Sequence, residues 1–304
     1  MPILTAVVGD GLGAWRARDT LGRCEVFGTH AERDLRDVPG SGPEAARRWA
    51  ELLDSPEIEL LVLAVPPEDR VALSRAARAA GKAVLLEEGP PLSLTELDQL
   101  AEDDVVGEAP MGMVLPLRGL LTLDHALTRI PWTALACGGL LVSTFAPDLG
   151  PPPGQGRALR PVTDRVRPAS RAALDAVSPY LDLVCQLFGE PVTAGLEGLD
   201  TGVAAGSVAF AFGARLSLVV TVRSVISDMQ LRLTDTERSV VLHGRELWVE
   251  DASGVMRHPV PPPGELRMSS YLDMARALRS GAATCRHSPQ STRLLADCLA
   301  LLRT

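Results

Sequence analysis

The sequence is short of cationic residues and of long apolar runs, and each shortage excludes a class of protein. Lys and Arg number 30 against 38 Asp and Glu, so the net charge of −8 provides no basic surface for nucleic acid or anionic lipid. No apolar run approaches the roughly 20 residues that cross a bilayer, and the first residues do not form a cationic leader followed by an apolar segment. We therefore expect a cytoplasmic protein whose partners include neither nucleic acid nor membrane.

Cysteine and lysine are scarce as well. The five cysteines are scattered without a C-x-x-C pair, and the five histidines show no metal-ligand spacing. We expect reduced thiols and no metal site. Lys82 is the single lysine, so a reaction that needs a catalytic lysine has one candidate.

Residues 1–114 alternate continuous apolar runs with amphipathic stretches. The apolar runs predict strands at 3–8, 24–29, 58–67, 83–87 and 105–108. Buried strands separated by helices are typical of a parallel sheet covered on both faces. We predict an α/β domain with a parallel sheet over 1–114.

Residues 115–304 follow a different pattern. Apolar and polar residues alternate between 206 and 251, as in antiparallel strands that have one face on a core. Two helices, at 269–281 and 288–303, are expected to close the chain. We predict an α+β domain built on an open, largely antiparallel sheet.

The segment Gly9-Asp10-Gly11-Leu12-Gly13-Ala14 follows the first strand and opens a helix. The first glycine permits a tight turn, the second lets backbone N–H groups approach a pyrophosphate, and the alanine allows close packing of the helix. A glycine-rich turn without a ligand is the alternative interpretation. The strand-turn-helix context favours a dinucleotide site that includes Gly9, Gly11, Leu12 and Gly13.

The end of the second strand bears on the choice of cofactor. Dinucleotide sites of this kind have an acidic residue there, which binds the ribose 2′-hydroxyl. Here Thr29 and His30 stand at the expected tip, with Glu32 and Arg33 beyond. A tip without a carboxylate and with a nearby arginine favours a 2′-phosphate, so NADP is the expected cofactor and NAD the alternative. A plain exposed loop arginine is the other interpretation of Arg33.

Two further motifs connect the chain to a known family. In the first half, Ala64-Val65-Pro66-Pro67 and Ala80-Gly81-Lys82-Ala83-Val84 are followed by Glu87. In the second half, Asp175 and Asp182 lie in a helical stretch that ends Gly-Glu-Pro-Val. With these motifs the chain resembles the Gfo/Idh/MocA oxidoreductases, the glucose-fructose oxidoreductase and inositol dehydrogenase family.

The resemblance implies an NAD(P)-dependent oxidoreductase with a Rossmann domain over 1–114 and a substrate and oligomerisation domain over 115–304. In relatives the open sheet forms a dimer interface, which implies a homodimer or homotetramer that binds a small-molecule substrate. The resemblance also implies that four further residues contact the cofactor: Ala64, Pro66, Pro67 and Glu87, the last near the nicotinamide ribose.

Two positions depart from the family pattern. Glu88 stands where the family has the lysine of a Glu-Lys-Pro motif, and Pro179 stands where it has a helix histidine. In the family these two groups normally handle the substrate proton, so a reductase of this type would need another residue for that role here. Lys82 lies at the opposite end of its strand and cannot replace the missing lysine.

Three residues are candidates for proton transfer. Glu88 can have its pKa raised toward neutrality if it is desolvated, and a solvated loop charge is the alternative. Tyr180 is expected in the first turn of a helix that begins at Ser178 and Pro179, where its phenol either donates a proton or packs against the core. Asp175 stands in an apolar stretch and needs a partner, either at the reacting site or in a structural hydrogen bond.

The resemblance, together with these departures, implies an NAD(P)H-dependent reductase of a small-molecule imine or carbonyl with a non-standard proton donor. Relatives that reduce thiazolinyl imines in peptide natural-product assembly also depart from the Glu-Lys-Pro motif, which suggests a biosynthetic role. The alternative is a non-redox protein that binds a nucleotide or small molecule as a regulator, scaffold or acid–base catalyst.

Overall fold

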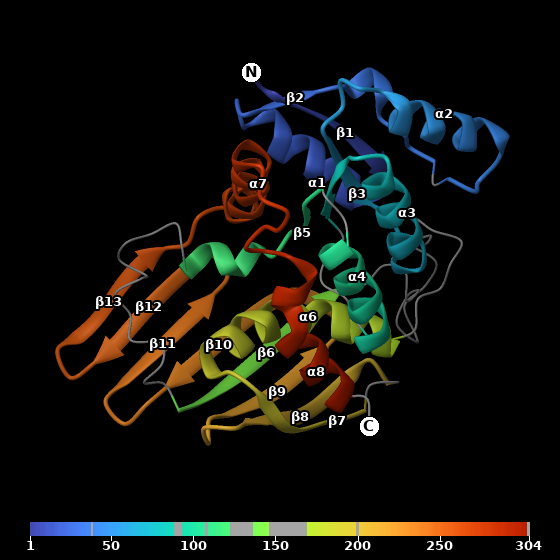
Figure 1. The fold of residues 1–304 in the computed structure, drawn as a ribbon. Coiled ribbons are helices and arrows are strands. Elements are labelled where there is room, and N and C mark those ends of the chain that lie inside the picture. Colours follow the sequence, from blue (N-terminus) through green and yellow to red (C-terminus); the bar gives the residue numbers. More distant parts are fainter. Residues whose placement is uncertain are drawn as a thin grey trace. The chain divides into compact units, whose positions relative to one another are not determined.

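The computed structural model describes residues 1–37, 39–87, 93–106, 109–121, 136–145, 169–198 and 201–302 (Figure 1). The chain divides into two units. The first comprises Met1–Leu123 together with Pro262–Arg293, and the second comprises Asp124–Pro261 together with Leu294–Thr304. A segment near the C-terminus, expected in the second domain, thus belongs to the first unit.

The first unit is built on a parallel sheet. Its strands lie in the order β2-β1-β3-β4-β5, and all neighbouring pairs are parallel. The strands are β1 (Ile3–Gly9), β2 (Phe27–Thr29), β3 (Leu60–Ala64), β4 (Ala83–Leu86) and β5 (Met111–Met113). β3 and β4 are buried along their whole length, as expected for strands covered on both faces. The predicted α/β fold is confirmed.

Helices cover both faces of this sheet. One face carries α2 (Pro43–Asp54), α3 (Pro67–Ala79) and α4 (Leu94–Val106), and the other carries α1 (Gly11–Gly22) and α7 (Pro263–Ser280). Successive side chains of β4 alternate between the two cores: Leu85 packs on the α1 and α7 side, whereas Leu86 packs on the opposite side. The residue after Leu86 is therefore directed toward α1 and α7.

The strand expected at 105–108 does not form. Val105 and Val106 are the last residues of α4, residues 107 and 108 lie outside the described ranges, and the fifth strand is Met111–Met113. Two β-branched residues are too short a run to specify a strand, whereas the apolar residues from Met111 to Leu115 are buried.

The second strand is interrupted and resumes further along the chain. Thr29 pairs with Thr5 of β1, the short 3-10 helix η1 (Ala31–Arg33) follows, and pairing with β1 returns at Leu35, opposite Val8. The strand therefore reaches its carboxyl end at Leu35 rather than at Thr29.

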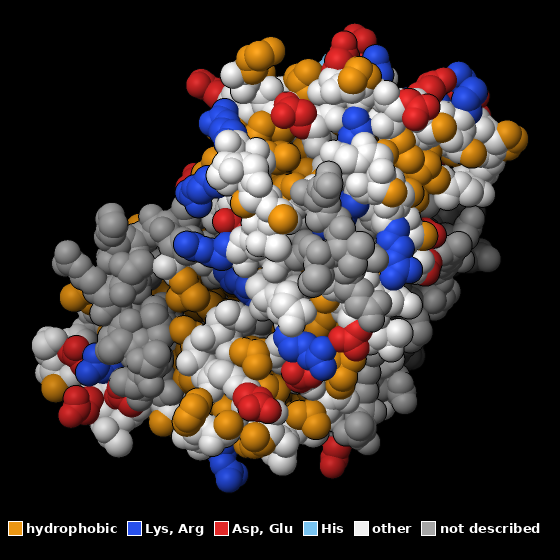
Figure 2. All heavy atoms as spheres, viewed as in Figure 1, with side chains coloured by type: hydrophobic (Ala, Val, Ile, Leu, Met, Phe, Trp, Pro, Cys, Tyr) orange, Lys and Arg blue, Asp and Glu red, His pale blue; other side chains and the backbone are white. Residues whose placement is uncertain are grey.

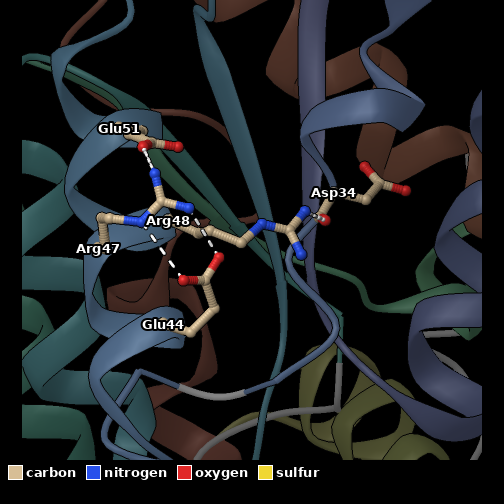
Figure 3. A network of polar contacts seen from close by, with 5 residues as sticks. All are labelled: Asp34, Glu44, Arg47, Arg48 and Glu51. Carbon is tan, nitrogen blue, oxygen red and sulfur yellow. Dashed lines mark hydrogen bonds and ion pairs between the residues drawn. The ribbon is translucent and has the colours of Figure 1, made fainter.

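The carboxylate of Asp34 bridges this interruption. Its Oδ1 accepts a hydrogen bond from the N–H of Val7 at 2.9 Å, and its Oδ2 accepts one from Nε of Arg18 at 2.7 Å. Its backbone oxygen accepts a hydrogen bond from Nη2 of Arg48 at 2.9 Å (Figure 3). One residue thus ties β1, α1 and α2 together.

The neighbouring Arg47 makes contacts of a different kind. Its guanidinium pairs with Glu44 at 2.7 Å and with Glu51 at 2.5 Å on the exposed side of α2 (Figure 3). Exposed pairs within one helix contribute a few tenths of a kcal/mol each. Arg47 therefore matters much less to the fold than the largely buried Asp34.

The second unit contains an eight-stranded sheet of order β13-β12-β11-β10-β6-β9-β8-β7. Neighbouring strands are antiparallel except β6 and β9, which are parallel. The strands are β6 (Cys137–Phe145), β7 (Pro191–Glu197), β8 (Val203–Phe210), β9 (Arg215–Thr221), β10 (Arg223–Thr234), β11 (Arg238–His243), β12 (Glu246–Asp251) and β13 (Gly254–Pro259). The predicted largely antiparallel sheet is confirmed.

The helix α6 (Ala169–Phe188) passes through Pro179, so the expectation of a helix beginning at Ser178 and Pro179 is wrong. A proline inside a helix has no N–H for the carbonyl four residues earlier, which here belongs to Asp175. The hydroxyl of Ser178 donates a hydrogen bond to that carbonyl at 3.1 Å. The side chain before the proline thus replaces the lost backbone bond.

The remaining helical segments are η2 (Pro116–Leu121), η6 (Pro289–Thr292) and α8 (Arg293–Leu301). The last predicted helix is thus divided in two, and α7 begins six residues earlier than expected. None of the helices in the described ranges is both long enough and apolar enough to cross a bilayer. On the face shown in Figure 2, acidic and basic side chains are interspersed.

Replacing Asp34 with alanine is expected to lower the free energy of unfolding by about 2 to 4 kcal/mol, because the N–H of Val7 and the guanidinium of Arg18 lose a charged acceptor. Urea denaturation measures the change. Asp19→Ala is the matched control, since Asp19 pairs with Arg23 at an exposed site and should cost about 0.5 kcal/mol. Equal effects of the two substitutions would contradict the bridging role of Asp34.

Candidate functional site

The glycine turn lies at the carboxyl end of β1. Gly9 has a φ of 123°, and a Cβ there would lie 1.9 Å from the backbone oxygen of Ala64. Gly11 has a φ of 72°, and a Cβ there would meet no atom within 4 Å. Gly9 is therefore required by the approach of β1 to β3, whereas Gly11 leaves open space beside the turn, as a pyrophosphate site requires.

The helix α1 begins directly after this turn. Gly13 and Ala14 are buried against the sheet, which brings the helix close to it, while Leu12 is exposed. The first N–H groups of a helix have no partner within the helix and form a natural anion site. The local structure is the one that the motif predicts.

Asp10 is the N-cap of α1 and competes with any anion for the N–H groups at this helix start. Its Oδ1 accepts a hydrogen bond from the N–H of Gly11 at 2.6 Å. The carboxylate thus occupies one donor that a bound anion would use and places a negative charge at the positive end of the helix. Asp10 is exposed, so a bound anion can displace its side chain at the cost of one cap, about 1 kcal/mol.

The turn after β3 lies beside the glycine turn. Ala64 pairs with Gly9, and Pro66 and Pro67 are the N-cap and first residue of α3. Proline suits the first helical position because its missing N–H would have no partner there. The structure thus brings Ala64 next to the glycine turn and places the two prolines directly after it.

Three residues expected at the tip of the second strand lie away from its carboxyl end. Thr29 is opposite Thr5 in the middle of β1, and the N–H of His30 donates to the oxygen of Thr5 at 2.9 Å. Arg33 ends η1, and its exposed guanidinium is 3.9 Å from Glu57.

Arg36 occupies the position next to the glycine turn instead. The N–H of Gly9 donates to the oxygen of Leu35 at 2.8 Å, and Arg36 follows Leu35 directly. Its side chain is exposed and makes no hydrogen bond or ion pair within the described ranges. Asp37, also exposed, comes next. The residue pattern does not point to Arg36, because it does not reveal the interruption of the strand.

Glu87 is wholly buried at the carboxyl end of β4, with 0 % of its side chain exposed. Its Oε2 accepts a hydrogen bond from the hydroxyl of Tyr271 at 2.7 Å, and its Oε1 pairs with the guanidinium of Arg267. Both partners belong to α7. The residue expected beside the cofactor thus has both carboxylate oxygens bound by a helix about 180 residues further along the chain.

A second buried polar cluster joins α7 to β5. The N–H of His287 donates to Asp273 at 2.9 Å, and Nδ1 of His287 lies 2.9 Å from the hydroxyl of Ser270. The N–H of Met113 in β5 donates to the oxygen of His287 at 2.8 Å. Burial lowers the pKa of His287 to about 4, despite the opposing charge of Asp273. The imidazole is therefore neutral near pH 7.

The three candidates for proton transfer differ in their surroundings. Glu88 lies outside the described residues. Asp175 is half-buried on α6. Tyr180, on the same helix, is buried and its hydroxyl donates to Sδ of Met229 at 3.3 Å. Burial, with a smaller effect of Asp228, raises the pKa of Tyr180 to about 12, which argues against proton donation by this phenol near neutral pH.

The fold of this chain is similar to that of solved structures. No protein-family model matches the chain, and no curated protein matches its sequence. Solved structures do match. Levoglucosan dehydrogenase in complex with NADH and levoglucosan is 17% identical with a TM-score of 0.75, and the match covers 100% of this chain and 96% of that chain.

Two other solved structures match over a similar extent. UDP-N-acetylglucosamine 3-dehydrogenase GnnA from Acidithiobacillus ferrooxidans is 17% identical with a TM-score of 0.72, covering 100% of this chain and 97% of that chain. Biliverdin reductase from Synechocystis sp. PCC 6803, in complex with biliverdin and NADP+, is 14% identical with a TM-score of 0.70, covering 100% of both chains. The two-part fold implied by the resemblance is confirmed over the whole chain.

A spectrophotometric titration tests the environment of the two phenols. Tyr180 and Tyr271 are the two tyrosines of the chain, and burial is the main cause that raises the pKa of both above the ordinary value. We expect the folded protein to show no tyrosinate absorbance below about pH 11, and the urea-unfolded protein to titrate near pH 10.

The same shift destabilises the fold at high pH, because the unfolded chain releases these protons first and stability falls as the pH rises above about 10. Tyr180→Phe and Tyr271→Phe assign the two steps. Tyrosinate absorbance at pH 10 in the folded protein would show that at least one phenol reaches solvent.

Proposed function

We propose that this chain is an NAD(P)H-dependent oxidoreductase that reduces a small-molecule imine or carbonyl, with NADPH as the preferred cofactor. The observation that carries the proposal is the glycine turn between β1 and α1, in which Gly11 has a positive φ and open space around it. Bound NADPH would supply a hydride, and the residues of the chain would hold the cofactor and transfer the proton.

Several described residues are suited to hold the cofactor. The turn from Gly9 to Gly13 and the N-terminus of α1 would bind the pyrophosphate. Arg36, at the carboxyl end of the second strand, would bind a 2′-phosphate through its guanidinium, in the role that the sequence suggested for Arg33. Asp37 is the competing group, because an acidic residue at this position favours the 2′-hydroxyl of NAD.

Proton transfer would fall to Glu88 or Asp175. Both are carboxyl groups, and a carboxyl group acts as an acid near pH 7 when desolvation raises its pKa. The pKa of about 12 leaves Tyr180 as the weakest of the three candidates. A biosynthetic role in the reduction of an imine fits a site without the lysine and histidine of the family pattern.

The N-cap of α1 favours a second candidate function. The carboxylate of Asp10 binds the N–H of Gly11 and would repel a pyrophosphate. A non-redox protein that binds an uncharged or cationic small molecule at this turn would not meet that repulsion. Asp10→Asn separates the two functions, since it should strengthen NADPH binding by several-fold if the turn is a pyrophosphate site.

The second unit is suited to self-association. Leu141, Val219 and Val203 are 38%, 43% and 55% exposed, and Leu141 and Val219 are partners on the adjacent strands β6 and β9. Eight strands about 4.8 Å apart and about seven residues long present a face of roughly 900 Å², close to the area that each partner contributes to a stable interface. We propose a homodimer formed through this sheet, with a homotetramer as the larger alternative.

The first test of the function is a fluorescence titration with NADPH and, separately, NADH. We expect NADPH to bind more tightly, and Arg36→Ala to weaken NADPH about tenfold or more while leaving NADH unchanged, because one charge-assisted contact with the 2′-phosphate is lost. Arg33→Ala is the matched control and should change neither affinity. Gly11→Ala should weaken both cofactors, since its Cβ would lie where the pyrophosphate approaches and the positive φ of this turn disfavours alanine.

Two other outcomes of this titration would contradict the preference for NADPH or the oxidoreductase itself. Tighter binding of NADH with no effect of Arg36→Ala would identify Asp37 as the residue that selects the cofactor. Failure of both cofactors to bind at millimolar concentration would exclude the oxidoreductase and leave the non-redox function.

Light scattering after size-exclusion chromatography tests the oligomer. The chain has a mass of 32.3 kDa, so a dimer should give about twice that value. Val219→Lys places a charge on the sheet face and should produce monomers. Phe212→Asp, at a highly exposed turn residue, is the control that should leave the mass unchanged. A monomeric wild-type protein would contradict the interface.

A further inference from the structure

The carboxyl end of β4 presents a guanidinium where the resemblance implies a carboxylate. Glu87 is wholly buried, while Arg267, which pairs with it, keeps 13% of its side chain exposed. Of the two paired side chains, Arg267 is therefore the one that a ligand could contact.

The hydrogen-bonding capacity of this guanidinium is mostly unused. Within the described ranges its Nη2 pairs with Glu87, and its Nε is buried without a partner. Buried N–H groups are nearly always bonded, and each one that is not reduces stability. The part of the side chain that stays exposed is the part that an acceptor on a ligand could contact without breaking the pair with Glu87.

The position of Arg267 matches the reach of a dinucleotide. β4 is the second neighbour of β1 in the sheet, so its end lies about 10 Å from the strand that carries the glycine turn. A dinucleotide whose pyrophosphate sits at that turn extends along the carboxyl ends of the strands. The end of β4 is then within reach of the nicotinamide half.

We propose that Arg267 donates a hydrogen bond to an oxygen of the nicotinamide half of the bound dinucleotide, and that Glu87 and Tyr271 are positioning residues that hold the guanidinium in place. The inference rests on the proposed function. Glu87 fixes one side of the planar guanidinium, and the hydroxyl of Tyr271 fixes the carboxylate at 2.7 Å. A lysine could pair with Glu87 but has no second, rigidly placed donor.

Calorimetric titration with two ligands tests this role. NADPH contains the nicotinamide riboside, and adenosine 2′,5′-bisphosphate lacks it. Arg267→Lys keeps the charge opposite Glu87 and should weaken NADPH about tenfold while leaving the bisphosphate unchanged. The double variant Glu87→Met with Arg267→Met removes both buried charges together and should show the same selective loss. Tyr271→Phe should give a smaller selective loss, because the arginine remains.

Arg276→Met is the matched control, since Arg276 is an exposed arginine on the same helix. It should change neither affinity. NADPH binding unchanged in both Arg267 variants would overturn the inference, and so would an equal loss of both ligands, which would indicate a structural role. If the wild-type protein binds neither ligand, the oxidoreductase proposal itself fails. This result differs from unchanged NADPH binding in the variants and from an equal loss of both ligands.

Discussion

A parallel sheet must be covered on both faces, and this constraint determines how the first unit is assembled. The first 121 residues provide α2, α3 and α4 for one face but only α1 among the described helices for the other. The apolar side chains of β4 that point to that second face would remain in water. The chain therefore has to return after the second sheet, and α7 supplies the missing cover with Tyr271, Met274 and Ala277.

The return of α7 also decides the chemistry at the end of β4. Once the helix covers this face, Glu87 is buried, and a buried carboxylate has to be paired and hydrogen-bonded. Tyr271 and Arg267 meet that requirement from the helix that causes the burial. The cluster of Ser270, Asp273 and His287 fastens the same helix to β5. The packing of α7 thus completes the core and also places the guanidinium of Arg267 at the end of β4.

The sequence predicts those parts of the structure that depend on neighbouring residues. Apolar runs locate β1, β3 and β4, the glycines locate the turn before α1, and alternation locates the strands of the second sheet. The interruption of the second strand depends on Asp34 bonding to Val7, and the environment of Glu87 depends on residues about 180 positions away. Patterns of neighbouring residues cannot predict such contacts. The sequence around Pro179 predicts a helix start for the same reason. The hydrogen bond from Ser178 that lets the helix continue through the proline is visible only in the structure.

The residues of a motif do not all support a function equally. A Cβ at Gly9 would collide with the backbone of Ala64, so this glycine is needed by the packing of β1 on β3 whether or not a ligand binds. Gly11 has no such collision, because a Cβ there would meet no atom within 4 Å. The same combination of a positive φ and open space occurs at the turns of Gly81 and Gly244, so it does not by itself identify a ligand site. Gly9 therefore does not distinguish a dinucleotide site from a plain turn, and at Gly11 the proposed site has to be weighed against the carboxylate of Asp10, which accepts the N–H of Gly11.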